Sequence, residues 1–455
     1  MIADEQVLEW VYAKASAIAK GEGGMGAMEK AVGLACREVQ RQALERTVQR
    51  AATATPLACS RCGEGLNASS RGRVRHVTSF YGKIRFARSH GYCPLCQMYD
   101  YPADVLLGLQ PRAPASPRVQ EVCALTALRA PAGQAQDDVR RLTGIDLDPS
   151  TLHQEARRQG GRALALRDAD VELARTPEGL LDLAARAAAP KAPFTLVIEI
   201  DAWNIRERDN WGRTERMRKA GEDTGRWHWV YTGTVFRLDQ RGTTESGRPV
   251  IAERGYIATR AGLDRFRDQL YAEAIQRGLL EAQTVLILAD GAIWIWNLAD
   301  DRFKGARQRV DLHHVQEHLW DLAQELFDPG SEKAKAWVAP YLSWLERRKD
   351  GALDVLHGLE GLRAATDPLD AAQREALERE IHYFETHQGR MDYKTGKASG
   401  QPVGSGAVES TCNQYQRRFK LPGQFWSLQG DEAFLALATL HRNGRWQQLF
   451  SHDAA

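Results

Sequence analysis

The segment Phe194-Thr-Leu-Val-Ile-Glu-Ile-Asp201 is an apolar run, rich in β-branched residues, that ends in an acidic residue. An unbroken run of this kind predicts a buried strand. A second run of the same type, Thr284-Val-Leu-Ile-Leu-Ala-Asp290, also ends in an aspartate. The surrounding pattern predicts further strands at 227–238, 249–259 and 309–312, and helices at 263–279, after Asp290 and after residue 312. The order β-β-β-α-β-α-β-α predicts an α/β domain.

The rest of the chain extends outward from this domain. Residues 313–395 are almost wholly helical in pattern, and 404–450 contains at least two more helices. Upstream, short helices with brief connections at 118–161 suit a helix-turn-helix. We therefore predict a multidomain α/β protein with five parts: an N-terminal helical region (1–55), a zinc-ribbon-like module (56–110), a helix-turn-helix-like region and connector (115–190), the α/β domain (194–320 with 400–455) and a helical insertion (321–399).

The first 50 residues form the N-terminal end of this plan. Small and apolar residues recur at three- and four-residue spacing, after a glycine-rich break at 21–26. This spacing predicts a helix whose buried stripe consists of Met28, Val32, Ala35, Val39 and Ala43.

Composition limits the class of protein. The 455 residues carry 61 Lys and Arg against 59 Asp and Glu, so any nucleic-acid affinity must come from local patches rather than from overall charge. The 39 glycines and 17 prolines are at an ordinary globular level, which excludes a collagen-like or low-complexity chain. No apolar run approaches the ~20 residues of a membrane helix, and the N-terminus lacks the features of a secretory signal, so we expect a cytoplasmic protein.

Four of the seven cysteines fall into two close pairs, Cys59-x2-Cys62 and Cys93-x2-Cys96. Each two-residue gap allows both sulfurs of a pair to reach one tetrahedral Zn²⁺. The interval between the pairs is longer than usual, but a hairpin pattern within it can absorb the extra length. We predict a structural zinc site, since four thiolates leave no open position for water. The alternative is four unrelated buried thiols.

Three acidic residues form a second constellation: Asp201 and Asp290 at strand ends, and Glu409 in Gly404-Ser-Gly-Ala-Val-Glu409-Ser. Carboxylates from neighbouring strands and a packed helix could hold two Mg²⁺ and activate an in-line attack on phosphorus. Glu199, two residues before Asp201 on the same strand face, is the fallback ligand. The alternative for each strand-terminal aspartate is a helix cap or a turn.

The segment Asp311-Leu-His-His314-Val-Gln-Glu-His318 leaves a short strand and opens a helix. His314 and His318 at i, i+4 could bind a metal. We favour the interpretation in which Asp311 caps the helix and the imidazoles orient their neighbours by hydrogen bonds.

A basic stretch follows Glu409. Arg417, Arg418 and Lys420 lie eight to eleven residues beyond the acid, and Trp426 comes next. On a continuing helix these cations return close to the face of Glu409, where they could contact a phosphate backbone. The alternative is a solvated helix face.

These pieces together resemble a bacterial insertion-sequence transposase of the DDE class, in the Mutator-like assemblage with an RNase H-like catalytic core. The resemblance is carried by Ile198–Asp201, Leu288–Trp296, Val310–Leu319 and Gly404–Ser410 with its Arg-rich continuation. It implies that Asp201, Asp290 and Glu409 are metal-binding catalytic acids, and that Asp311 and His314 form the supporting Asp-x-x-His element. It also implies that the long interval before Glu409 is a helical insertion. The segment Asp201-Ala-Trp-Asn departs from the Asp-Gly-Thr-like run that relatives often carry.

The resemblance implies a DNA transposase that uses two Mg²⁺ or Mn²⁺ ions to cut element ends and transfer strands to target DNA. The zinc module and the helix-turn-helix region would bind terminal inverted repeats, while Arg417, Arg418, Lys420 and Trp426 would contact DNA. A homo-oligomer, a dimer or larger, is implied because two ends must be joined. Two alternatives stay open: a non-catalytic zinc-ribbon and helix-turn-helix DNA-binding regulator, and a metal-dependent nuclease without strand transfer.

Overall fold

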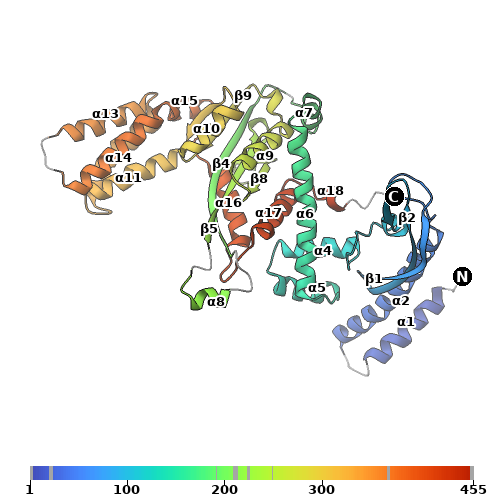
Figure 1. The fold of residues 1–455 in the computed structure, drawn as a ribbon. Helices are drawn as coiled ribbons and strands as arrows, with labels where there is room; N and C mark the ends of the chain where they lie inside the picture. The colour runs from blue at the N-terminus through green and yellow to red at the C-terminus, as the bar shows by residue number, and fades with distance from the viewer. Residues whose placement is uncertain are drawn as a thin grey trace. The chain divides into compact units, whose positions relative to one another are not determined.

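The structure is a computed structural model that describes residues 4–19, 24–190, 192–208, 214–222, 226–247, 249–365 and 369–450. The chain divides into two compact units, residues 1–160 with 447–455 and residues 161–446. Helix α6 (Pro149–Leu173) begins in the first unit and ends in the second. The predicted multidomain α/β organisation is confirmed (Figure 1). Within the described residues, no helix combines the length and apolar character needed to cross a membrane.

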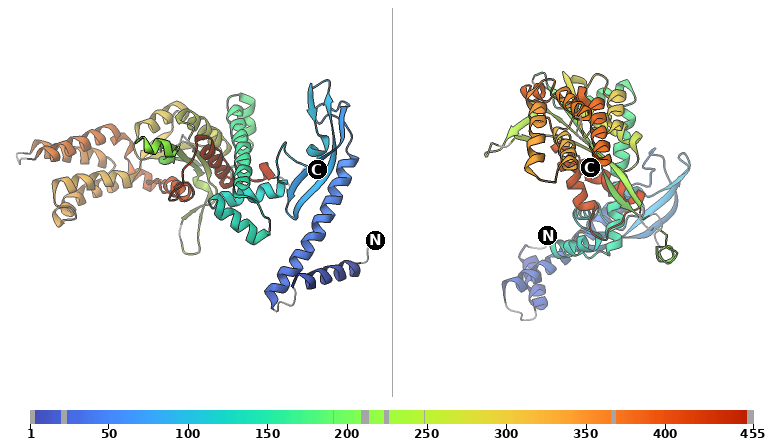
Figure 2. Two further views of the ribbon diagram at one scale, coloured as in Figure 1. Left: turned by 60° about the horizontal axis from the view of Figure 1, so that its bottom comes forward. Right: turned by 90° about the vertical axis from the view of Figure 1, so that its left-hand side faces the viewer.

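The first unit opens with two helices, α1 (Asp4–Ala19) and α2 (Met25–Ala54), which pack side by side (Figure 2). Their contact is made by small side chains, with Ala15, Ala31 and Ala35 buried. The predicted stripe is therefore wrong at both ends, because Met28, Val32 and Ala43 are exposed. Alanines allow two helices to approach closely, and the larger residues beside them are left facing solvent.

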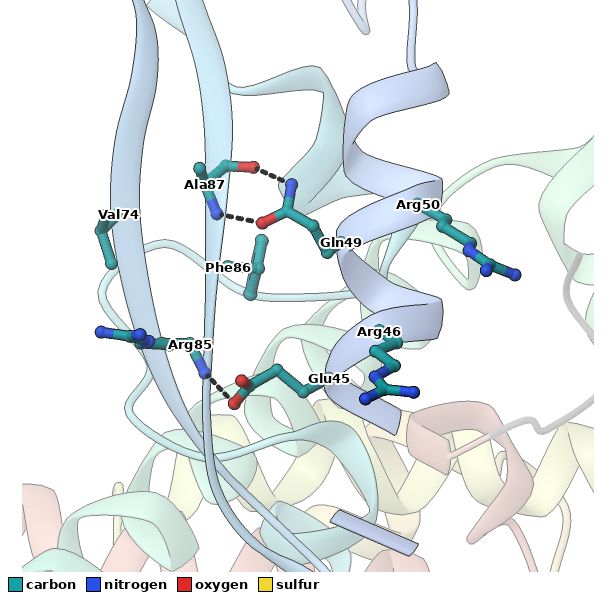
Figure 3. A pocket seen from close by; sticks show the side chains of 8 residues that line it. All are labelled: Glu45, Arg46, Gln49, Arg50, Val74, Arg85, Phe86 and Ala87. Atoms are coloured by element: carbon teal, nitrogen blue, oxygen red, sulfur yellow. Dashed lines mark hydrogen bonds between the residues drawn. The ribbon is translucent and has the colours of Figure 1, made fainter. Parts of the chain in front are cut away.

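A three-stranded antiparallel sheet follows, in the order β1 (Asn67–Ser79), β2 (Gly82–Cys93), β3 (Met98–Asp100). Helix α2 packs along β2, and the Gln49 side chain pairs with both backbone groups of Ala87, accepting from its N–H at 2.8 Å and donating to its carbonyl at 3.1 Å (Figure 3). A glutamine thus hydrogen-bonds to an open strand edge where a further strand would otherwise pair. The N-terminal helices and the cysteine module, predicted as separate regions, share one core through Leu44, Val48 and Phe86.

Short helices complete the first unit: α3 (Pro102–Leu106), α4 (Pro117–Ala127), α5 (Ala132–Thr143), the start of α6, and α18 (Gln447–Phe450). Helices α4 and α5 pack on each other, and Pro117 and Pro149 stand at helix starts, where a missing N–H is tolerated. The three helices α4 to α6, with brief connections, match the predicted helical region.

The second unit is built on a five-stranded mixed sheet, in the order β10 (Arg307–Val310), β9 (Thr284–Ala289), β4 (Thr195–Glu207), β5 (Arg226–Arg237), β8 (Gly255–Thr259). Strands β10, β9 and β4 run parallel, and β5 and β8 are antiparallel to their neighbours. Strand β4 is longer than predicted and continues six residues past Asp201, because its antiparallel pairing with β5 extends to Glu207. The predicted strand at 249–259 is two strands, since β7 (Pro249–Ile251) pairs instead with β6 (Arg241–Thr243).

Helices cover both faces of this sheet. Helices α9 (Leu263–Gln276) and α10 (Ile293–Arg302) pack on the face that carries Ile198 and Ile200. Helix α16 (Gly406–Phe419) packs on the opposite face, where Ala407 contacts the core around Val197, and α17 (Leu428–Arg442) packs against β8. The Phe194–Ile200 run is apolar without alternation because both of its faces are buried.

The helices predicted for 313–395 are present. Helices α11 (Leu312–Leu326), α12 (Glu332–Arg347), α13 (Gly351–Ala364) and α14 (Ala371–His387) pack in sequence, and α14 returns to α11 (Figures 1 and 2). The unit also contains α7 (Pro177–Ala184), α8 (Thr214–Lys219), α15 (Tyr393–Ala398) and the short 3-10 turns Leu238–Gln240, Leu279–Glu281 and Gln388–Arg390.

Candidate functional site

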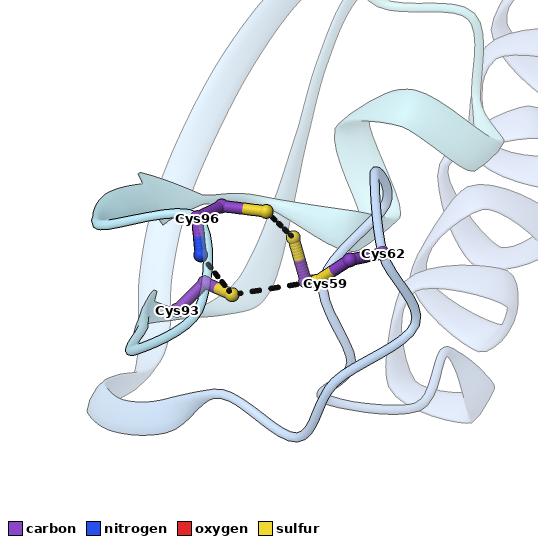
Figure 4. Close-up of side chains that lie close together, drawn as sticks. All are labelled: Cys59, Cys62, Cys93 and Cys96. Atoms are coloured by element: carbon purple, nitrogen blue, oxygen red, sulfur yellow. Dashed lines mark hydrogen bonds between the residues drawn. The ribbon is translucent and has the colours of Figure 1, made fainter.

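The four paired cysteines form one cluster in the first unit. The ligand atoms of Cys59, Cys62, Cys93 and Cys96 all lie within 4.8 Å of one another (Figure 4). The Sγ–Sγ distances are 3.9 Å between Cys59 and Cys96 and 3.6 Å between Cys62 and Cys93. Four sulfurs at 2.3 Å from a tetrahedral zinc ion would be about 3.8 Å apart. The cysteines can therefore hold a structural metal such as zinc, as predicted.

The backbone of the two cysteine pairs explains how the cluster forms. The residue after each pair, Gly63 and Gln97, has a positive φ (77° and 55°), which turns the chain back over the sulfurs. The Cys96 N–H donates to Cys93 Sγ at 3.3 Å. Backbone N–H groups near Cys59 likewise lower the pKa of its thiol to about 7. Amides directed at sulfur favour the thiolate, which is the form that binds metal.

Two arginines beside the cluster are held inside the module. Arg75 Nη1 lies 2.6 Å from Asp104 Oδ2 and Arg88 Nε lies 2.7 Å from Asp104 Oδ1, and all three side chains are largely buried. The Arg88 guanidinium also lies over the Tyr101 ring at 4.3 Å. These two cations therefore stabilise the fold of the module, whereas Arg73 is exposed.

In the second unit, the parallel strands bring the predicted aspartates together. The β4–β9 pairing ends at Glu199 and Leu288, so Asp201 and Asp290 each lie two residues further along neighbouring strands. The β9–β10 pairing ends at Ala289 and Val310, and Asp311 follows directly. Because these strands run parallel, the carboxylates of Asp201, Asp290 and Asp311 lie toward the same end of the strands.

The environment of Asp201 reflects this crowding. Burial raises the pKa of Asp201, and the charge of Asp290 raises it further. The Cys412 thiol on α16, the Ala202 N–H at 2.6 Å and the charge of His314 act in the opposite direction. Asp201 thus lies near groups from β9, α11 and α16.

Two buried carboxylates fix the N-terminus of α16, the helix that carries Glu409. Glu199 accepts from the Val408 N–H at 2.8 Å, and burial raises the pKa of Glu199 to about 8. Asp311 accepts from the Ser405 hydroxyl at 2.6 Å and from the Ser405 N–H. Donors at a helix start have no partner within the helix, so acceptors from the sheet are stabilising there. Glu199 is consequently a buried acceptor for α16 rather than the fallback metal ligand.

Glu409 lies in the first turn of α16 and is exposed, with Oε1 accepting from the Ser405 hydroxyl at 3.2 Å. Cys412, three residues along the same helix, hydrogen-bonds to Asp201. Burial raises the pKa of the Cys412 thiol, and the charges of Asp201 and Glu409 raise it further. The structure therefore brings Asp201, Asp290 and Glu409 into one neighbourhood.

The spacing of the three acids bears on which metal they could hold. In the described part of the chain, the four cysteines are the only group of three or more ligand atoms within 4.8 Å of one another. The acids are therefore not closed around a single ion.

The alternative roles for the aspartates also hold in part. Asp311 caps α11, accepting from His313 N–H at 2.5 Å and His314 N–H at 3.3 Å, which confirms the favoured interpretation. Asp290 accepts from the Ala292 N–H at 3.0 Å in a local turn. His314 and His318 do not converge: His314 Nδ1 lies 3.1 Å from Glu317, and His318 Nδ1 lies 2.7 Å from Glu380 on α14.

The basic stretch after Glu409 divides into exposed and packed residues. Arg417 and Lys420 are exposed at the end of α16. The Arg418 guanidinium lies 5.2 Å from the Trp426 ring, and burial lowers the pKa of Arg418 to about 10. Trp426 is only 4% exposed, and its ring stacks on Phe419. The prediction that Trp426 contacts DNA needs correction, because its side chain belongs to the core.

Sequence reasoning missed two residues of this site. Ser405 joins Asp311 to Glu409, and its position directly before α16 is the ordinary place of a helix N-cap, so the signal was present. Tyr383 of α14 directs its hydroxyl at the Asp290 carbonyl at 3.5 Å, and nothing local in the sequence points to that contact.

No family model matches the chain, and no curated protein matches it.

Proposed function

We propose that the chain is a DNA transposase of the DDE class, with Asp201, Asp290 and Glu409 as its catalytic acids. The observation that carries the proposal is the shared strand register. Asp201 on β4 and Asp290, the residue directly after β9, each lie two residues beyond the last paired residues of these parallel strands, and α16 adds Glu409. Two carboxylates that the register brings to neighbouring positions repel each other, so a bound cation would stabilise the pair.

The order of strands supports an RNase H-like core for this domain. Numbered along the chain, the five strands of the sheet lie in the order 5-4-1-2-3, with the first three antiparallel and the last two parallel to the first. The long helical segment α12 to α15 lies between the fifth strand and the helix that bears Glu409. This is the arrangement that the sequence resemblance implies.

Asp201, Asp290 and Glu409 would hold two Mg²⁺ or Mn²⁺ ions. Such ions lower the pKa of a bound nucleophile and neutralise charge on the attacked phosphate. The acids have their own part in this: Asp201 must be ionised, and the nearby Cys412 and His314 favour that form. The buried acceptors Glu199 and Asp311 hold the start of α16 in place, which supports a fixed position for Glu409 in the first turn of that helix.

The reaction proposed is attack of water on a phosphodiester at the element end, with departure of the 3′-oxygen as a free hydroxyl. That hydroxyl then attacks a phosphodiester of target DNA, and a second 3′-oxygen leaves. Arg417 and Lys420, exposed beyond Glu409, are placed to bind phosphates. We assign binding of the terminal repeats to the cysteine module and helices α4 to α6, and we expect a dimer or larger assembly.

Nicking of supercoiled plasmid tests this proposal. The wild-type chain should convert plasmid carrying the element ends to nicked products only with Mg²⁺ or Mn²⁺. Asp201→Asn, Asp290→Asn and Glu409→Gln should each abolish nicking while duplex binding stays intact. Asp239→Asn, an acid paired with Arg237 elsewhere in the domain, is the matched control. Unchanged nicking in the Asp290→Asn variant would favour a protein that only binds DNA.

A further inference from the structure

Two tryptophans on β5 are exposed, whereas the other tryptophans described in this unit are buried or half-buried. Trp227 is 60% exposed and Trp229 is 55% exposed, and in the described residues only Trp10 joins them among exposed tryptophans. Both lie where β4 and β5 continue past the end of β8 and extend toward α8 (Figure 1). Burying an indole gives a large stabilisation that an exposed indole lacks. The exposed pair Trp227 and Trp229 therefore indicates a site that a ligand covers.

The two rings are on one face of the ribbon. Residues two apart on a strand share a face, and their Cα atoms are about 6.8 Å apart. That is roughly twice the ~3.5 Å separation of atoms in van der Waals contact, so a flat ring fits beside or between the two indoles. The partner strand places Asn204 opposite Trp229 and Arg206 opposite Trp227 on the same face.

Cations alternate with the aromatic rings. The Arg206 guanidinium lies 6.0 Å from the Trp227 ring and 4.8 Å from the Phe425 ring. The Arg208 guanidinium lies 3.8 Å from the same Phe425 ring. Backbone hydrogen bonds from Arg208 N–H to the Trp426 carbonyl and from Trp426 N–H to the Arg206 carbonyl hold these residues together. We call Arg206, Arg208, Trp227, Trp229 and Phe425 the aromatic ribbon.

The charge around the aromatic ribbon is positive. The last turn of α8 carries Arg216, Arg218 and Lys219, and all three are exposed, with Lys219 paired to Glu215 of the same helix at 3.2 Å. Glu207, the acid within the ribbon, is buried and paired with Arg260, so it contributes little negative field at the surface. A polyanion with flat, unpaired rings matches this surface in both charge and shape.

We propose that the aromatic ribbon binds unpaired bases of single-stranded DNA, with the indoles stacking on bases and the arginines contacting phosphates. The inference rests on the proposed function and deepens it. Trp229 lies opposite a residue three positions beyond Asp201, about 10 Å along β4, on the face opposite Asp201. The ribbon would therefore hold a strand that has separated next to the cut, not the phosphate that reacts.

Measuring the affinity of the full-length protein for oligonucleotides tests this inference. Binding is measured without added divalent ions, at a fixed ionic strength of about 0.1 M. The probes are fluorescein-labelled oligo(dT) and a mixed-sequence duplex of the same length. Loss of one stacked base lowers affinity about 5- to 150-fold, so the double variant Trp227→Ala/Trp229→Ala should bind oligo(dT) at least about tenfold more weakly, with duplex binding within about twofold. Trp227→Phe/Trp229→Phe should keep most of the affinity, because phenyl rings also stack.

Three controls make the outcome decisive. Trp10→Ala removes an exposed indole on α1 and should change neither affinity. Oligo(dT) should quench indole fluorescence in the wild type and lose most of that quenching in the double alanine variant. Unchanged oligo(dT) affinity, equal losses for both probes, or a change only in oligomeric state by sedimentation would each overturn the inference. Because no cleavage is needed, a protein that binds through the ribbon but fails to nick plasmid would refute only the proposed function.

Discussion

Asp311 offers the sharpest test of how the site is assembled, because one buried carboxylate joins two helices. It is fully buried and accepts four hydrogen bonds, two from the start of α11 and two from Ser405 at the start of α16. In Asp311→Asn the side-chain oxygen can still cap α11, since asparagine is as good an N-cap as aspartate. The amide nitrogen then faces the Ser405 N–H, so two donors oppose each other.

The magnitude follows from that conflict. Losing a hydrogen bond to a charged acceptor costs about 1.5 to 3 kcal/mol, and a buried N–H without a partner costs about 1 to 3 kcal/mol, which together give about 2.5 to 6 kcal/mol. The start of α16 should open more readily by that amount, and its amides should exchange about 60- to 20,000-fold faster unless global unfolding sets the limit. Ser405→Ala, which removes only the hydroxyl, should cost about 0.5 to 1.5 kcal/mol.

Hydrogen exchange of peptides that cover 400–419 measures this directly. Asp370→Asn is the control, because Asp370 caps α14 at an exposed site and its replacement keeps the cap. If the amides at the start of α16 exchanged at the wild-type rate in Asp311→Asn, the assignment of Asp311 as the residue that holds α16 would be refuted.

Three further predictions concern metal and pH. Cys93→Ser should release zinc, detected by a chromogenic chelator, and lower the melting temperature of the first unit, whereas Cys36→Ser, outside the cluster, should do neither; retention of stoichiometric metal in Cys93→Ser would contradict the site. Burial beside Glu207 raises the pKa of Asp431, so the protonated Asp431 side chain stabilises the fold in acid and this stabilisation is lost as pH rises. Asp431→Asn should therefore raise the thermal midpoint at pH 8 and change it little at pH 4. A larger change at pH 4 than at pH 8 would contradict this sign. Burial also raises the pKa of Asp201, so Mn²⁺ affinity, followed by electron paramagnetic resonance, should increase with pH above the ordinary aspartate range. Because the Cys412 thiol lowers the pKa of Asp201, Cys412→Ala should move this increase to higher pH. An increase at the same pH as in the wild type would contradict the prediction.

The strands that form the centre of the sheet could be predicted because burial on both faces leaves an unbroken apolar run. The runs ending at Asp201 and Asp290 became β4 and β9, and the paired cysteines converged as their spacing indicated. The two strands follow from the apolar residues within each run, and the cysteine cluster follows from the two-residue gap within each pair.

Features that depend on a distant partner could not be predicted. Strand β4 continues to Glu207 because β5 pairs with it, and no sequence pattern after Asp201 predicts that pairing. Glu199 was assigned by its strand face alone, but the amides of α16 take its carboxylate. Trp426 looked like a surface aromatic beside arginines, and only the packing of Phe419 and Phe434 places it in the core.

The central claim is that Asp201, Asp290 and Glu409 act together on a phosphodiester. Mapping of nicks at nucleotide resolution tests it most directly, with the chain incubated with its own flanking DNA and Mg²⁺ or Mn²⁺. The account predicts cuts at the two element ends that leave 3′-hydroxyls, joined products with target DNA, and loss of both in Asp290→Asn. Metal-independent nicks, nicks scattered without regard to the ends, or wild-type cutting by Asp290→Asn would contradict it.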